Sequence, residues 1–306
     1  LGLSRSAVWK QLHQLDALGL EVVSVAGRGY RLGEPLDLLR REQILAALDG
    51  SVLQGCESLE VAAVIGSTSA ALMAGPAPRP GHWRCLLAEH QTAGRGRRGR
   101  RWLSPYAGGL CLSLGWSFAS PPRDLPALSL AAGIAVRRAL AALGVADARL
   151  KWPNDVLLDG AKLAGILVDV DGDARGPLRA VIGIGLNLSA PAAMAQAIVA
   201  DGGVVPARLD ATALAGRGGR NALAAALIGA LHAMLVGFAE QGFAPLAAEW
   251  GRYDQLRDQP VVVTGAATRI TGIARGIAAD GALLVEGPGG AITPLYAGDV
   301  SLRGGG

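Results

Sequence analysis

The chain has 306 residues, of which 51% are hydrophobic and 18% are charged, and its formal net charge is +4. A chain with this much apolar surface can bury a core, so the composition excludes an intrinsically disordered protein. The length is sufficient for two or three domains, and the small positive charge permits an anionic partner without requiring one.

Cysteine usage and hydropathy indicate a cytoplasmic protein that makes no contact with a membrane. Cys56, Cys85 and Cys111 lack CxxC spacing, so we expect buried free thiols in a reducing compartment. No signal peptide is visible. No apolar run reaches the roughly 18 residues of a membrane span, and we expect the closest candidate, segment 221–237, to be a packed helix.

The first part of the chain predicts the back half of a winged helix-turn-helix. Val8, Leu12 and Leu15 share one face of a helix predicted over residues 4–18. Residues 21–32 follow as a β-hairpin around a Gly-Arg-Gly turn. The first helix of a winged helix-turn-helix and the start of its turn are missing, so we expect only a partial DNA-binding unit.

The middle of the chain predicts an α+β domain with a central mixed sheet and helices on one face. Strands mostly follow strands, and helices are grouped rather than alternating with them, which argues against a doubly wound parallel sheet. The predicted strands are 59–65, 84–89, 110–117, 148–151, 155–158, 163–170 and 179–188. The predicted helices are 36–48, 68–74, 125–143 and 221–240.

The last part of the chain predicts a small β-barrel of SH3 type. Its four short apolar runs, separated by turn dipeptides such as Asp280-Gly281, are 261–263, 270–274, 282–285 and 292–295. We therefore expect three domains: a partial winged helix-turn-helix over 1–33, a catalytic domain over 34–255 and the SH3-like domain over 256–306.

A basic, glycine-rich loop at residues 94–101 is the first candidate for chemistry. It holds five arginines and three glycines in eight positions. Glycine lets the backbone approach a ligand closely, and the arginine fork matches phosphate and carboxylate oxygens. We interpret the run as a loop that closes over an anionic ligand; a solvated basic loop or a nucleic-acid patch is the alternative.

A second polar cluster, Lys151-Trp152-Pro153-Asn154-Asp155, follows at the end of a predicted strand. Proline interrupts the strand, so the neighbouring side chains can face a pocket instead of extending a ladder. Lys151 could meet phosphate, Asn154 could bind an amide or ring edge, and Asp155 could hold a metal or orient an amine. The alternative is an ordinary strand–turn–strand with solvated charges.

Lys162 stands at the start of the strand predicted over 163–170. A lysine beside the basic loop repels the arginines unless an anion lies between them, which favours a contact with a carboxylate or a phosphate. A lysine that extends to water is the alternative.

Taken together, these segments resemble the biotin–protein ligases, and among them the bifunctional bacterial type that also represses the biotin operon. The resemblance covers nearly the whole chain in the same order. Its segments are Ser67-Thr68, Glu89 to Arg100, Lys151 to Asp155, Lys162 to Leu167 and Gly183 to Leu188.

The resemblance implies that ATP and biotin give biotinyl-5′-adenylate, with Mg²⁺ present. The biotinyl group then passes to one lysine of a carrier, the biotin carboxyl carrier protein of acetyl-CoA carboxylase. It also implies a homodimer, and operator DNA as a partner only if the N-terminal domain is complete. No residue stands out as a base for the acceptor lysine.

The resemblance also implies the site residues. Those expected at biotin are Ser67, Thr68, Ser69, Gln91, Gly94, Arg95, Gly96, Arg97 and Lys162. Those expected at ATP or the adenylate are Arg98, Arg100, Trp102, Lys151 and Asn154. The catalytic role is assigned to Lys162, Arg97 and Asp155, with Asp155 also the ligand for Mg²⁺. Ser69 stands where many relatives carry asparagine.

Two competing functions stay open at this stage. A lipoate–protein ligase shares the fold, although the arginine loop and the Lys151–Asp155 block favour biotin. A DNA-binding repressor without enzymatic activity would use Arg5, Lys10 and Gln11 on the first helix, with Arg28 on the wing touching phosphate.

Overall fold

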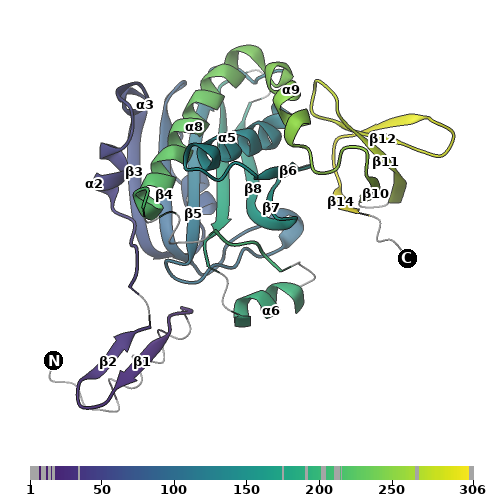
Figure 1. The fold of residues 1–306 in the computed structure, drawn as a ribbon. Coiled ribbons are helices and arrows are strands. Elements are labelled where there is room, and N and C mark those ends of the chain that lie inside the picture. The colour runs from purple at the N-terminus through teal and green to yellow at the C-terminus, as the bar shows by residue number, and fades with distance from the viewer. Residues whose placement is uncertain are drawn as a thin grey trace.

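The computed structural model describes residues 7, 12, 15, 18–33, 35–173, 176–189, 192–200, 205–209, 214, 216–265 and 269–302. Within these ranges the chain builds a two-stranded hairpin, a seven-stranded sheet covered by helices, and a five-stranded sheet (Figure 1). Figure 1 shows the hairpin standing apart from the large sheet on one side, with the five-stranded sheet on the other.

The N-terminal hairpin forms as predicted. Strands β1 (Val22–Val25) and β2 (Gly29–Leu32) pair antiparallel. Most of the helix predicted over residues 4–18, with Arg5, Lys10 and Gln11, lies outside the described residues. Leu18, at the end of the predicted helix, contacts the rest of the protein: its carbonyl accepts a hydrogen bond from the Tyr106 backbone N–H at 2.8 Å.

The large sheet is mixed, as the order of elements predicted. Its strand order is β3-β4-β5-β9-β8-β7-β6; only β3 and β4 run parallel, and each other neighbouring pair is antiparallel. The strands are β3 (Cys56–Ile65), β4 (Trp83–Gln91), β5 (Gly109–Phe118), β6 (Arg149–Lys151), β7 (Asp155–Leu158), β8 (Ala161–Gly172) and β9 (Leu178–Asn187).

The longest helices cover one face of this sheet, as predicted. They are α5 (Leu128–Ala142), α8 (Gly219–Gln241) and α9 (Ala244–Tyr253) (Figure 1). In α5, Gly133 lies against Ile166 of β8. The short helix α4 (Thr68–Ala74) lies on the opposite face, where Ser69 meets Gly183 of β9. The remaining short elements are α2 (Arg41–Ala46), α3 (Gly50–Gln54), η1 (Arg97–Gly99), η2 (Leu125–Ala127) and α6 (Ala192–Ala200).

The helix predicted over 36–48 begins only at Arg41, because a buried ion pair holds the preceding residues extended. Glu89 and Arg220 are 2.6 Å apart, and each side chain is 4% exposed. Glu89 also accepts from the Leu39 N–H, and Arg220 donates to the carbonyl of Asp37, both at 2.6 Å. The pair therefore joins the linker, β4 and the start of α8.

Two described helices are long and apolar enough to cross a membrane by length and composition alone, contrary to the sequence argument. They are Leu125–Ala142 and Gly219–Gln241. Both pack against each other and against the large sheet, and the core helix of a globular protein passes the same test.

The C-terminal strands form an open antiparallel sheet in the order β13-β12-β11-β10-β14. Its strands are β10 (Pro260–Thr264), β11 (Arg269–Ile277), β12 (Leu283–Glu286), β13 (Ile292–Leu295) and β14 (Asp299–Leu302). Among the described residues the edge strands β13 and β14 do not pair with each other, so the predicted barrel is not closed. Strand β14, which the sequence analysis did not predict, carries a residue of the functional site.

We expect Glu89→Gln to lower the free energy of unfolding by about 3 kcal/mol, because it leaves the buried Arg220 charge without its counter-ion. Urea unfolding measures this change. Arg138→Ala is the control, since its partner Glu249 and its own side chain are partly exposed, and its loss is expected to stay within about 1 kcal/mol. Equal losses in the two variants would contradict the role given to the buried pair.

Candidate functional site

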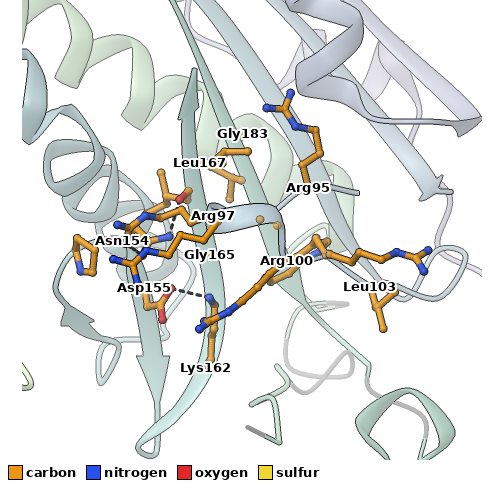
Figure 2. A pocket seen from close by; sticks show the side chains of 18 of the residues that line it. Arg95, Arg97, Arg100, Leu103, Asn154, Asp155, Lys162, Gly165, Leu167 and Gly183 are labelled. Atoms are coloured by element: carbon orange, nitrogen blue, oxygen red, sulfur yellow. Dashed lines mark hydrogen bonds and ion pairs between the residues drawn. The ribbon is translucent and has the colours of Figure 1, made fainter. Parts of the chain in front are cut away.

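A cavity of about 620 Å³ lies between the arginine loop and the face of the large sheet that carries α4. Its walls come from the loop, the start of α4, the Lys151–Asp155 turn, β8, β9 and β14. The structure thus brings together the two basic segments and the lysine that the sequence analysis selected (Figure 2).

Glycines on β8 and β9 make the floor of the cavity. A Cβ on Gly185 would lie 2.2 Å from the Trp102 ring, and one on Gly183 would lie 2.4 Å from Ser69 Oγ. A Cβ on Gly94 would lie 2.4 Å from the Trp102 carbonyl oxygen. Because glycine has no side chain, Trp102 and α4 can pack directly against the sheet.

A cluster of hydroxyl and amide groups lies at the start of α4. Ser67 caps the helix by accepting from the Ala70 N–H at 3.4 Å. Gln91 Oε1 accepts from the backbone N–H and the hydroxyl of Thr68, at 2.8 and 3.1 Å. These polar groups are the ones assigned to biotin from the sequence, and they lie side by side in the fold.

Ser113 completes this cluster, and the sequence analysis missed it. Its Oγ lies 2.7 Å from Thr68 Oγ1 and 2.9 Å from Ser69 Oγ, and the residue has no exposed surface. The available signal was a serine within a strand, β5, whose every residue is buried. A buried hydroxyl needs a partner, so a serine there indicates a polar contact.

Lys162 and Asp155 form an ion pair on the opposite side of the cavity. The two side chains come from the neighbouring strands β8 and β7, and their charged atoms are 2.6 Å apart (Figure 2). The Lys162 ammonium also lies 5.8 Å from the centre of the Trp102 ring. In this structure the anion beside Lys162 is a carboxylate of the protein itself, and a contact of Lys162 with a carboxylate or phosphate of a ligand stays a prediction.

Arg97 lies beside Asn154, and both point toward the same wall of the cavity (Figure 2). Arg97 donates to Asn154 Oδ1 at 3.1 Å and to the Gly298 carbonyl at 3.3 Å. Asn154 in turn donates to the Ile166 carbonyl at 2.8 Å. Burial lowers the pKa of the Arg97 guanidinium, although Asp299 opposes that shift.

Asp299 of β14 forms ion pairs with three arginines of the loop and so joins the loop to the C-terminal sheet. Its carboxylate lies 3.0 Å from Arg98, 3.1 Å from Arg100 and 3.9 Å from Arg97. Arg98 also donates to the Thr264 carbonyl at 3.2 Å. Arg98 and Arg100, which were expected at the nucleotide, and Arg97, which was expected at biotin, therefore converge on one carboxylate that the sequence analysis did not identify.

Arg95 does not join this group. It points away from Lys162 and pairs with Asp169 at 3.1 Å (Figure 2). Lys151, at the end of β6, lies opposite Asp155 in the sheet register and lines the cavity. Gly96 also lines it, and its N–H donates to the Arg100 carbonyl at 2.7 Å.

The donor set does not fit a magnesium site held by the protein. The described residues contain no group of three or more His, Cys, Asp or Glu side chains that could hold a metal ion. Asp155, the expected ligand, is already neutralised by Lys162. Mg²⁺ usually binds through nucleotide phosphates with one or two protein oxygens, so a magnesium ion here would depend on the phosphates of the bound nucleotide.

The cysteines take no part in this chemistry. Cys85 and Cys111 are buried and Cys56 is half-buried, all as free thiols. Burial raises the pKa of Cys111 to about 11 and raises that of the other two thiols. Thiols in this state are poor nucleophiles at neutral pH.

Comparison with known proteins agrees with this geometry. Residues 80–187 match the Biotin/lipoate A/B protein ligase family, residues 258–303 the Biotin protein ligase C terminal domain, and residues 1–31 an HTH domain. The solved biotin protein ligase from Aquifex aeolicus in complex with biotin and ATP superposes with a TM-score of 0.63 at 26% identity. The superposition covers 81% of this chain and 99% of that one.

Relatives of known function match over most of their length. The bifunctional ligase/repressor BirA of Escherichia coli is 39% identical over 99% of this chain and 90% of its own. The biotin–[acetyl-CoA-carboxylase] ligase of Mycobacterium tuberculosis is 37% identical over 88% of this chain and 97% of its own. The chain therefore belongs to the biotin protein ligases.

Proposed function

We propose that the cavity under the arginine loop is where this biotin protein ligase joins biotin to ATP and keeps the adenylate until a carrier lysine takes the biotinyl group. One observation carries the proposal. A neutral cluster of hydroxyls and an amide, around Thr68 and Gln91, faces a cationic group of Lys162 and Arg97 across a single cavity. Biotin has the same asymmetry, with a neutral ring system at one end and a carboxylate at the other.

The hydroxyl cluster suits the ureido ring. A urea has both donors and acceptors, and Ser67, Thr68, Ser69 and Gln91 supply both kinds of group. Ser113 orients the Thr68 and Ser69 hydroxyls through its own bonds to them.

The cationic group suits the acid and the nucleotide. A biotin carboxylate oxygen attacks the α-phosphorus of ATP, the bond from that phosphorus to the oxygen leading to the β-phosphate breaks, and pyrophosphate leaves. Charge grows on the phosphate oxygens during this step, and fixed cations stabilise it. We assign Lys162 to the oxygens between biotin and the α-phosphate, and Arg97, Arg98 and Arg100 to the phosphates.

The two carboxylates Asp155 and Asp299 hold these cations in place before ATP binds. In our proposal, phosphate oxygens compete for the same donors, so Lys162 and the arginines exchange one anion for another without entering water. Trp102 and the loop then cover the adenylate and exclude water from the mixed anhydride. We assign Asn154 and Lys151 to contacts with the nucleotide.

The second half-reaction needs only a positioned amine. The neutral amine of the carrier lysine attacks the biotinyl carbonyl carbon, and AMP leaves with the electron pair of the anhydride bond. The amide bond is complete when the nitrogen releases one proton to water. We propose a biotin carboxyl carrier protein as the acceptor, and a cytoplasmic ligase that forms a homodimer and does not contact a membrane. The three-domain division of the chain at residues 33 and 255 is part of this proposal.

The central test is incubation with ATP, biotin and a biotin carrier domain, followed by intact-mass measurement of both proteins. We expect one biotinyl group on the carrier and none with lipoate in place of biotin. The ligase has only three lysines, Lys10, Lys151 and Lys162, so labelling of the ligase itself is readily separated from labelling of the carrier. An unmodified carrier, or one modified by lipoate, would overturn the proposal.

Lys162→Gln is expected to slow adenylate formation by about 100-fold or more, because it removes a fixed charge from the developing transition state. Pyrophosphate release measures this step. Lys151→Gln is the matched comparison from the same cavity, and we expect it to raise KM for ATP with a much smaller change in kcat. If both variants lose kcat equally, Lys162 has no special role in the chemical step.

Asp299→Asn is expected to loosen the arginine loop. The ion pairs are partly exposed, so their loss amounts to about 1 kcal/mol, which corresponds to about fivefold faster tryptic cleavage within residues 95–101. Glu249→Gln, which breaks an ion pair far from the loop, is the control. Unchanged cleavage in the Asp299 variant would show that the carboxylate does not hold the loop.

The HTH match over residues 1–31 also supports a second function. We propose that the N-terminal domain binds operator DNA, with the exposed Arg28 at the tip of the wing touching phosphate. Arg28→Ala should then weaken binding about equally on operator and unrelated duplexes, and lower the salt slope by about one. Gel shifts at several salt concentrations measure this; an unchanged slope would exclude the contact.

A further inference from the structure

Arg179, on β9, makes a set of contacts that the ligase chemistry above does not use. Its side chain is 11% exposed. One terminal nitrogen donates to the carbonyls of Leu72 and Gly75, at 3.2 and 2.7 Å, and the other donates to the carbonyl of Met73 at 2.8 Å. All three carbonyls belong to the C-terminal end of α4 or to its cap, Gly75.

These are the carbonyls that a helix leaves without partners inside itself. A cation at this end is also favoured by the helix dipole, and the arginine fork can bond several carbonyls at once. Helix α4 has only seven residues, and a helix of that length is not stable alone. Its position therefore depends on the groups that hold its ends.

The other end of α4 is held by the same strand. Ser69 lies directly over Gly183, where a Cβ would come within 2.4 Å of its hydroxyl. Arg179 and Gly183 are four positions apart on β9, so both face α4. Four residues of a strand span about 13 Å and seven residues of a helix about 10 Å, so this segment of β9 is long enough to reach both ends of the helix.

The position of α4 decides where its hydroxyls lie. Thr68 and Ser69 reach Ser113 at 2.7 and 2.9 Å, and Thr68 also reaches Gln91. Hydrogen bonds weaken within a few tenths of an ångström, so a small tilt of the helix would break this cluster. The contacts at the far end of α4 thus bear on the polar groups inside the cavity.

We propose that Arg179 is a positioning residue for biotin: by holding the C-terminal carbonyls of α4, it fixes the hydroxyl cluster that receives the ureido ring. This inference rests on the assignment of biotin to that cluster. Arg179 does not touch the substrate. Its effect reaches biotin through seven residues of helix, and it does not extend to the phosphates on the far side of the cavity.

The structure supplies a control in Asp171, which lies opposite Arg179 on β8 and pairs with it at 3.0 Å. The Asp171 side chain is 64% exposed, so the ion pair is screened by water. The carbonyl bonds, and not this ion pair, hold the helix in our proposal. Removing the Asp171 charge should therefore leave biotin binding unchanged.

The test is a comparison of Arg179→Ala, Arg179→Lys and Asp171→Asn by calorimetric titration with biotin and by adenylation kinetics. For Arg179→Ala we expect the biotin Kd and KM to rise about tenfold, because a shift of the order of an ångström in a positioning element has effects of this size or larger. KM for ATP and kcat should stay within about twofold. Arg179→Lys should recover part of the loss, and Asp171→Asn should match the parent chain.

Each outcome supports or overturns the inference. A folded Arg179→Ala with the parent's biotin Kd overturns it, as does an equal rise in KM for biotin and for ATP. If Arg179→Ala is insoluble, Arg179→Lys decides: a raised biotin Kd with an unchanged KM for ATP supports the role, and an unchanged biotin Kd overturns it. If the parent chain itself does not bind biotin, the assignment of the cavity fails first, and the inference fails with it.

Discussion

The concentration of positive charge around one cavity is the constraint on which this structure depends. Lys162 and three loop arginines share the walls of a single space, and like charges at such separations repel unless an anion lies between them. The fold meets the constraint with two carboxylates from different parts of the chain, Asp155 on β7 and Asp299 on β14. Lys162 is thereby paired with Asp155, and the three arginines with Asp299.

The same constraint explains why the C-terminal sheet belongs to the site. On that side of the loop, Asp299 supplies the carboxylate that three arginines reach, and Asn154 supplies a further acceptor. The carbonyls of Gly298 and Thr264 add further acceptors from the same sheet. A segment that looks like a separate small domain in the sequence thus supplies the counter-ion of the arginine loop.

Local patterns in the sequence were sufficient for the parts of the site that are continuous along the chain. The arginine loop, the Lys151–Asp155 block and Lys162 each show unusual polarity within a few residues, and the α+β class followed from the order of strands and helices. Asp299, Ser113 and Arg179 could not be found in this way. Each is an ordinary residue in a short or apolar strand, and its importance comes from a partner at least 40 residues away along the chain.

Strand β9 carries both residues whose role the sequence pattern indicates and a residue whose role it does not indicate. Gly185 admits Trp102, Gly183 admits Ser69, and Arg179 holds the end of α4, all from one face of one strand. Of these residues only the glycines could be predicted from the sequence, because a small residue at every second position of a strand indicates close packing. The arginine carries no such signal, since its role depends on the length of a helix on the neighbouring surface. The strand therefore sets both the depth of the cavity and the position of the polar groups that line it.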